Sequence, residues 1–136
     1  MKQNKKELLL KDLCARLPYG VKVNEDIQGD FTLIGLSKER VFTTCEVEGY
    51  FNDFPIELIK PYLFPLSSMT EEQNDSWRDA WFPDLLTSTD VNYPESEKYL
   101  AVSHAKSLDW LYKNHIDIYG FIEKGLAIDA TGLNIY

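Results

Sequence analysis

Residues that readily bind metal ions or transfer protons are scarce in this chain, which has two histidines and two cysteines. His104 and His115 fall on one face of a predicted helix but about 16 Å apart along its axis, so one ion cannot bind both. No His-x-x-x-His spacing is present. We therefore interpret His104 as a half-buried polar residue. We interpret His115 as a helix-end residue whose charged imidazole suits the helix dipole.

The cysteines have neither a metal-like nor a redox-like spacing. Cys14 lies on or beside the apolar stripe of a predicted helix, and Cys45 points with the apolar side of a predicted strand, so both are expected to be buried. A reducing, cytoplasmic compartment fits this usage. There is no Gly-x-Ser-x-Gly elbow and no glycine-rich phosphate loop. The sequence thus predicts no cofactor, no metal and no catalytic residue. A small metal-dependent or hydrolytic enzyme using His104 and His115 with carboxylates is the alternative.

An acidic, aromatic stretch is the most distinctive feature. Aromatic residues spaced four apart on a helix are typical of core contacts, but in an exposed position they would anchor a protein interface within a charged rim. The candidate protein-interaction residues are Trp77, Asp79, Trp81, Phe82 and Asp84. Another protein is therefore the expected partner.

Charge is distributed unevenly along the chain. Residues 1–22 hold six basic residues and two acids, a net charge of +4. Because the whole chain has a net charge of −8, the remaining residues carry −12. An acidic surface repels phosphate backbones and disfavours nucleic-acid binding. Binding of nucleic acid through the basic first helix is a second alternative. No stretch reaches the roughly 18 apolar residues of a membrane span, so no membrane association is expected.

The first half of the chain is predicted to be a helix followed by short strands. The helix covers about residues 5–17, with Leu9 and Leu13 on its buried stripe and Asp12 and Arg16 facing solvent. Strands follow at about 19–24, 31–36 and 40–50, then a turn at 49–53 and a short strand. A one-turn helix at 54–59 precedes an edge strand at 60–63 that tolerates Pro61. This order is found in small SH3-like barrels.

The second half is predicted to be helical. Ser68 and Thr70 both begin capping boxes for a helix at about 70–82, and a polar loop follows at 83–95. A helix at about 95–115 has two apolar stripes, so we expect it to lie between the sheet and another helix. A short helix at 117–124 should end at Gly125, and the apolar tail 126–136 should pack back.

Together these elements predict an α+β fold in one compact unit. Residues 1–66 would form the N-terminal helix and a small antiparallel sheet or SH3-like barrel. Residues 67–136 would form C-terminal helices packed on it.

Three segments of the sequence look familiar together. They are Leu8–Val21, Ile59–Thr70 and the segment from Asp109–Leu111 through Gly120–Ala127. The chain resembles a group of small uncharacterised proteins of Bacteroides-type gut bacteria, often borne by phages and other mobile elements. Residues 71–97 are not part of that pattern. The resemblance implies a bacterial or phage cytosolic origin and supplies no activity, cofactor or catalytic residue. The function expected is a non-enzymatic protein-interaction module, an accessory of a phage or mobile element.

Overall fold

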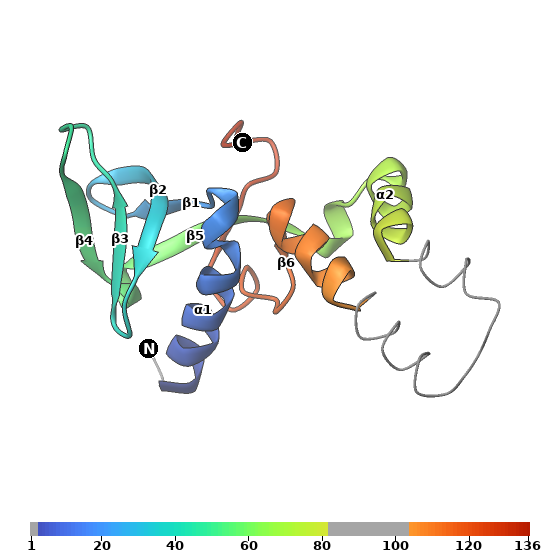
Figure 1. The fold of residues 1–136 in the computed structure, drawn as a ribbon, viewed down its shortest axis with the longest axis horizontal. Helices are drawn as coiled ribbons and strands as arrows, with labels where there is room; N and C mark the ends of the chain where they lie inside the picture. Colours follow the sequence, from blue (N-terminus) through green and yellow to red (C-terminus); the bar gives the residue numbers. More distant parts are fainter. Residues whose placement is uncertain (1–2, 82–103) are drawn as a thin grey trace.

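The computed structural model describes residues 3–81 and 104–136, and it shows an α+β fold as predicted (Figure 1). Helix α1 (Gln3–Arg16) is followed by strands β1 (Lys22–Glu25), β2 (Gly29–Leu36), β3 (Arg40–Thr44), β4 (Phe51–Pro55) and β5 (Ile59–Pro65). Helix α2 (Glu71–Trp81), a helical stretch at 104–113, β6 (Ile116–Asp117) and β7 (Ile128–Asp129) complete it. Single 3₁₀ turns η1 (Leu17–Tyr19), η2 (Ile56–Leu58) and η3 (Leu66–Ser68) lie between elements.

The strands form a mixed sheet in the order β4-β3-β2-β1-β5-β6, with β7 also paired to β5. The first five strands are antiparallel, as predicted. The two C-terminal strands run parallel to β5, which the sequence did not indicate. The SH3-like barrel is not closed, because within the described residues β4 pairs with β3 alone.

Strand β5 is central, so the prediction of an edge strand was wrong. Its first half pairs with β1, and Pro61 lies opposite Val23. Its second half, Tyr62–Pro65, pairs with β7 on one edge and with β6 on the opposite edge, because the Leu63 carbonyl accepts from Ala130 and the Phe64 N–H donates to His115. Proline has no N–H for a ladder, and here the second partner strands begin only after Pro61. The strand therefore has neighbours on both sides without requiring that missing donor.

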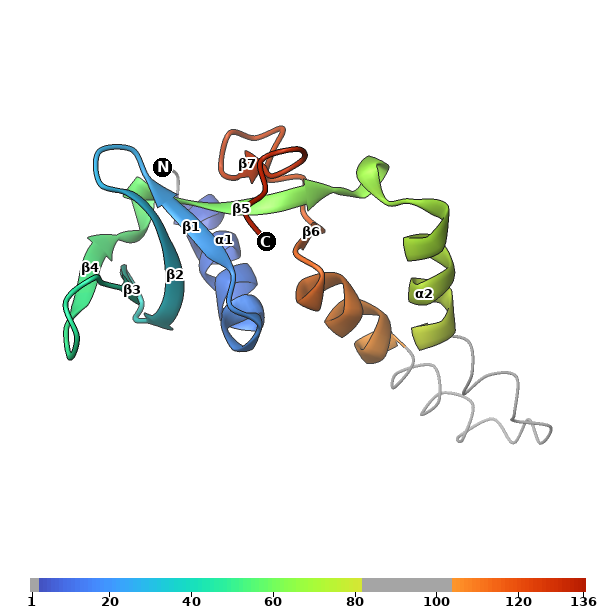
Figure 2. The same ribbon diagram turned by 90° about the horizontal axis from the view of Figure 1, so that it is seen from above.

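Helix α1 packs beside β1 and β5 (Figure 2) and supplies Leu9 and Leu13 to the core, both fully buried as predicted. Phe121 and Ala127 from the last part of the chain join the same core. The strands, the residue before β1 and the turn η2 contribute the rest: Val21, Val23, Leu33, Val41, Phe54, Ile56, Ile59 and Leu63. The core thus includes residues from both sides of the predicted division at residue 66.

Two predictions about α1 were wrong. Cys14 is exposed rather than buried, and Asp12 and Arg16 are fully buried rather than exposed. The Arg16 guanidinium donates from Nε to Asp12 Oδ2 at 2.7 Å and from Nη2 to the Ile116 carbonyl at 2.6 Å. The helix therefore has a second packed face, turned towards the C-terminal segment. That face contains positions 12 and 16 and leaves Cys14 in solvent.

The C-terminal half contains one confirmed cap and one wrong helix. Thr70 and Gln73 form the predicted capping box, with the Thr70 N–H donating to Gln73 Oε1 at 2.8 Å and the Gln73 N–H to Thr70 Oγ1 at 3.1 Å. Residues predicted as a helix at 117–124 instead form the end of β6 and a series of turns. Asp117 accepts the N–H groups of Phe121 and Ile122, which fixes a turn where a helix was expected.

The helical stretch at 104–113 confirms the end of the predicted helix at 95–115; its beginning and the loop at 83–95 lie outside the described residues. Trp110 donates from Nε1 to Ser76 of α2 at 3.2 Å. On the other side, Tyr19 donates to Asp109, and Arg16 lies over the Tyr112 ring at 5.1 Å. This stretch therefore lies between α1 and α2 rather than between the sheet and a helix.

The tail packs back as predicted. β7 pairs with β5, and the Tyr136 hydroxyl accepts the Lys22 N–H at 2.9 Å and donates to the Tyr62 carbonyl at 2.7 Å. Ala127 and Ala130 are buried. These contacts make the last residues part of the folded unit.

The buried ion pair of α1 leads to a stability prediction. Arg16→Met should lower the free energy of unfolding by about 3–5 kcal/mol, because it leaves the Asp12 carboxylate buried without its partner. The double variant Asp12→Leu/Arg16→Met should recover most of that loss. Urea unfolding followed by circular dichroism measures both, and a double variant as unstable as the single one would contradict this explanation.

Candidate functional site

The residues predicted to bind a partner are only partly described. Trp77 is half-buried and Asp79 is exposed, and both lie on α2. The Trp81 side chain, Phe82 and Asp84 lie outside the described residues. A partner site on this stretch stays a prediction.

The histidines do not have the expected environments. His104 is exposed rather than half-buried. His115 follows the helix with φ of 60° and stacks on Tyr136, with ring centroids 3.7 Å apart and planes 9° apart. Burial, with the nearby Arg16 guanidinium, lowers the pKa of His115 to about 4. The imidazole is therefore neutral near pH 7, and the prediction of a charged helix-end histidine was wrong.

Buried charges gather around Arg16 but serve the fold. Asp12 and Arg16 side chains have no exposed surface, and the guanidinium binds both carboxylate oxygens of Asp12. Burial raises the pKa of Asp12, although Arg16 opposes this. The Asp117 carboxylate is occupied by two backbone N–H groups. Because solvent does not reach this cluster, a substrate would not either.

Metal ligation finds no support among residues 3–81 and 104–136, where no three of His, Cys, Asp and Glu gather to hold an ion. A hollow of about 590 Å³ between the end of β5 and the turn after β6 contains Asp117 and Glu123. Its described lining has no histidine. Cys45 is half-buried just after β3 and Cys14 is exposed, both as free thiols. The described lining of this hollow therefore lacks the combination of a histidine with carboxylates on which the alternative enzyme hypothesis depends.

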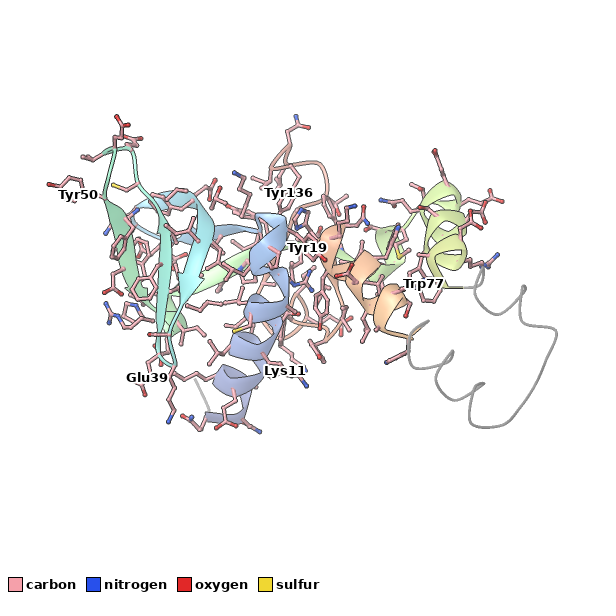
Figure 3. All side chains as sticks on the ribbon, viewed as in Figure 1. Lys11, Tyr19, Glu39, Tyr50, Trp77 and Tyr136 are labelled. Carbon is pink, nitrogen blue, oxygen red and sulfur yellow. The ribbon has the colours of Figure 1, made fainter. Side chains whose placement is uncertain are left out.

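Four of the nine exposed large apolar side chains in the described residues lie on β2, on β4 and in the loop between β3 and β4. Tyr50 is 72 % exposed and Phe51 59 %, and in Figure 3 Tyr50 points away from the rest of the protein. Ile34 and Val47 are about half exposed, at 49 % and 56 %. With the half-buried Phe42 they form a patch that we call the hairpin surface: Ile34, Phe42, Val47, Tyr50 and Phe51.

The strand register explains why these side chains face outward. Val41, Thr43 and Phe54 are buried on the core side of β3 and β4, so the alternate residues Phe42 and Phe51 are on the opposite side. The Phe42 and Phe51 rings meet edge to face with centroids 5.5 Å apart. A Cβ at Gly35 would lie 3.4 Å from the Phe42 ring, in van der Waals contact, so position 35 faces the same side as that ring. The outer face is thus built by ordinary strand alternation.

The loop between β3 and β4 carries the other exposed residues. β3 ends at Thr44 rather than at residue 50 as predicted, and Gly49 has φ of 84°, a conformation that favours glycine. The Tyr50 N–H donates to the Val47 carbonyl at 3.2 Å. This turn places Val47 and Tyr50 at the tip of the hairpin.

The hairpin is acidic. Residues 44–58 hold four acids and no Lys or Arg. Asp53 pairs with Arg40 and Glu57 with Lys6, each at 2.7 Å. Within the described residues Glu46 and Glu48, on either side of Val47, form no ion pair. Negative charge therefore borders the apolar patch.

The hairpin surface was not predicted from the sequence, although a signal for it was present. The pattern of acids and aromatic residues that predicts a partner site at 77–84 also occurs at 46–53. Residues 46–50 are instead part of the strand predicted at about 40–50. The Gly49-Tyr50-Phe51 sequence was the available sign that the alternation ends there.

Comparisons with protein-family models, curated proteins and solved structures find no match for this chain. In the part of the chain that the structure describes, no helix has the length and apolar character needed to cross a membrane.

The neutral His115 leads to a pH prediction. As pH falls from about 6.5 to 4, the unfolded chain binds a proton at His115 and the folded chain does not, so stability should fall. His115→Asn, which tolerates the positive φ, should lack this part of the loss, about 1–3 kcal/mol. Urea unfolding at a series of pH values compares the two proteins; equal slopes over this window would contradict a depressed pKa.

Proposed function

We propose that the protein is a non-enzymatic protein-interaction module whose contact surface is the hairpin surface. The exposure of Tyr50 and Phe51, side by side in sequence on the β3–β4 hairpin, is the observation that supports this most. Aromatic side chains are the usual anchors of protein interfaces, since they bury a large area for little loss of side-chain freedom. A clustered apolar patch on an otherwise charged surface is typical of a binding site.

Charge suggests the kind of partner. Glu46 and Glu48 border the patch, and the whole chain has a net charge of −8. Such a rim speeds encounter with a basic surface and repels acidic ones. A protein with apolar and basic residues side by side is therefore the favoured partner.

Nucleic-acid binding through α1, the second alternative, is less favoured once the partners of the basic residues are known. Lys6 is engaged with Glu57 and Glu39, and Arg16 is buried. Lys5 and Lys11 remain exposed on the helix. Two scattered lysines offer weak attraction to a phosphate backbone, whose binding grows with the number of contacts.

The setting we propose, an accessory protein of a bacterial phage or mobile element acting in the cytoplasm, rests on the sequence resemblance alone. The interaction role does not depend on it.

A fragment library of bacterial proteins displayed on yeast, selected with the labelled chain, tests the proposal. Selected fragments should lose about tenfold or more of their affinity for Tyr50→Ser and Phe51→Ser variants, because anchors carry most binding energy. The matched control is Leu133→Ser, since Leu133 is 51 % exposed against 59 % for Phe51 but lies in the C-terminal tail. Fragments that bind both hairpin variants as tightly as the control would contradict the assignment.

A further inference from the structure

We propose that β4 accepts an extended segment of the partner as an added β-strand, and that this segment alternates apolar residues with Lys or Arg. The inference rests on the proposed function and names the partner's chemistry and its mode of binding at the hairpin surface. An open strand edge binds extended peptides through main-chain hydrogen bonds, and side-chain pockets select the sequence.

The register of β4 identifies which backbone groups are available. Pro55 lies opposite Arg40, and the Ile56 N–H donates to the Glu39 carbonyl at 3.0 Å, the bond that flanks a non-hydrogen-bonded pair. Hydrogen-bonded and non-hydrogen-bonded pairs alternate along the two strands, starting from the non-hydrogen-bonded pair Pro55–Arg40. The N–H and C=O groups of Asn52 and Phe54 therefore point towards β3. Those of Phe51 and Asp53, with the Pro55 carbonyl, point outward. This edge, with which no strand of the described residues pairs, thus offers two donors and three acceptors.

One acceptor has a contact within the chain. The Arg40 guanidinium donates from Nη2 to the Asp53 carbonyl at 3.4 Å, while Nε binds the Asp53 carboxylate at 2.7 Å. The longer bond is near the limit of hydrogen-bond geometry. An incoming N–H can replace it while the shorter ion pair remains.

The outer face next to this edge carries two aromatic rings beside the Arg40–Asp53 ion pair. Phe51 is on β4 itself and Phe42 on the neighbouring strand, with their rings in contact. Side chains of an added strand on the same face would lie beside Phe51, at cross-strand distances where aromatic and β-branched residues stabilise each other. Val or Ile at alternate positions of the partner segment fits this face.

Charge distinguishes a foreign segment from a second copy of the chain. Two copies paired antiparallel along β4 would place their Asp53 carboxylates side by side, and each chain has a net charge of −8, so like charges oppose pairing. The Glu46 and Glu48 carboxylates, which precede the strand and form no ion pair within the described residues, attract Lys and Arg. The occupant we infer is therefore a basic, apolar strand from another protein.

The probe for this inference is a capped peptide of about eight residues in which Lys and Val alternate. Its affinity is measured by calorimetry at low salt on the intact chain. A block peptide of the same composition, all Lys followed by all Val, is the control for charge alone, and it should bind about tenfold more weakly because it cannot match the alternating faces.

Backbone N-methylation provides the readout specific to strand addition. Methylating the Val nitrogens removes the donors on one edge of the peptide, and methylating the Lys nitrogens removes those on the other. In an antiparallel pair with β4, the peptide N–H groups that bond to β4 belong to the residues whose side chains share the face of Phe51, here the Val residues. Methylating the Val nitrogens should therefore weaken binding about tenfold or more, and methylating the Lys nitrogens should weaken it little. Parallel pairing would reverse the two sets and still support strand addition.

A pair of protein variants tests the same edge from the other side. Asp53→Pro and Asp53→Ala both remove the ion pair with Arg40, but the proline also removes the outward N–H of residue 53. The proline variant should bind the peptide several-fold more weakly than the alanine variant, with unfolding curves confirming that both are folded.

Three outcomes overturn the inference. These are no binding of the alternating peptide, equal effects of the two methylated sets, and pairing of the chain with itself along β4. If library fragments still bind in a manner that Phe51→Ser abolishes, the proposed function survives such a result and only the strand-addition mode fails. Loss of strand addition together with insensitivity to Phe51→Ser would reject both.

Discussion

The contact between Arg16, Asp12 and the Ile116 carbonyl connects parts of the chain that are 100 positions apart. A buried arginine is costly unless it is paired, and the bonds of Nε and Nη2 fix where α1 lies relative to β6, while Nη1 has no hydrogen-bond partner within the described residues. Strand β6 in turn pairs with β5, which carries the C-terminal strand β7 and pairs with β1. The ends of the chain are thereby assembled around one central strand. The His115–Tyr136 stack closes the same region.

This assembly covers one side of the sheet. Leu9 and Leu13 of α1 belong to the same buried cluster as the core-facing residues Val41 and Phe54. The outer residues of β3 and β4 receive no comparable cover from the described residues. A rigid, packed inner face supports an outer face whose apolar residues are already in position. Binding there would require little reordering of the chain, which lowers the entropic cost of forming a complex.

Local patterns predicted much of the fold. The apolar stripe of α1, the strand alternation of β1–β3 and the Thr70–Gln73 capping box depend on near neighbours in sequence, and each was recognisable there. The burial of the Asp12–Arg16 pair was not recognisable, because oppositely charged residues at i,i+4 are typical of the solvent-exposed face of a helix. Its burial depends on the Ile116 carbonyl, which is far away in the sequence. The two-residue parallel strands and the left-handed His115 also depend on partners far along the chain. For the candidate site, the sequence supplied the right pattern of acids and aromatics, but alternation concealed its occurrence at residues 46–53.

Amide hydrogen exchange of β4 tests the central claim most directly. In the free protein the N–H groups of Phe51 and Asp53 should exchange quickly and those of Asn52 and Phe54 slowly, since only the latter pair reaches β3. Saturation with the alternating Lys-Val peptide should slow Phe51 and Asp53 to the rate of their neighbours. Unchanged exchange at Phe51 and Asp53 in the saturated complex would contradict the account.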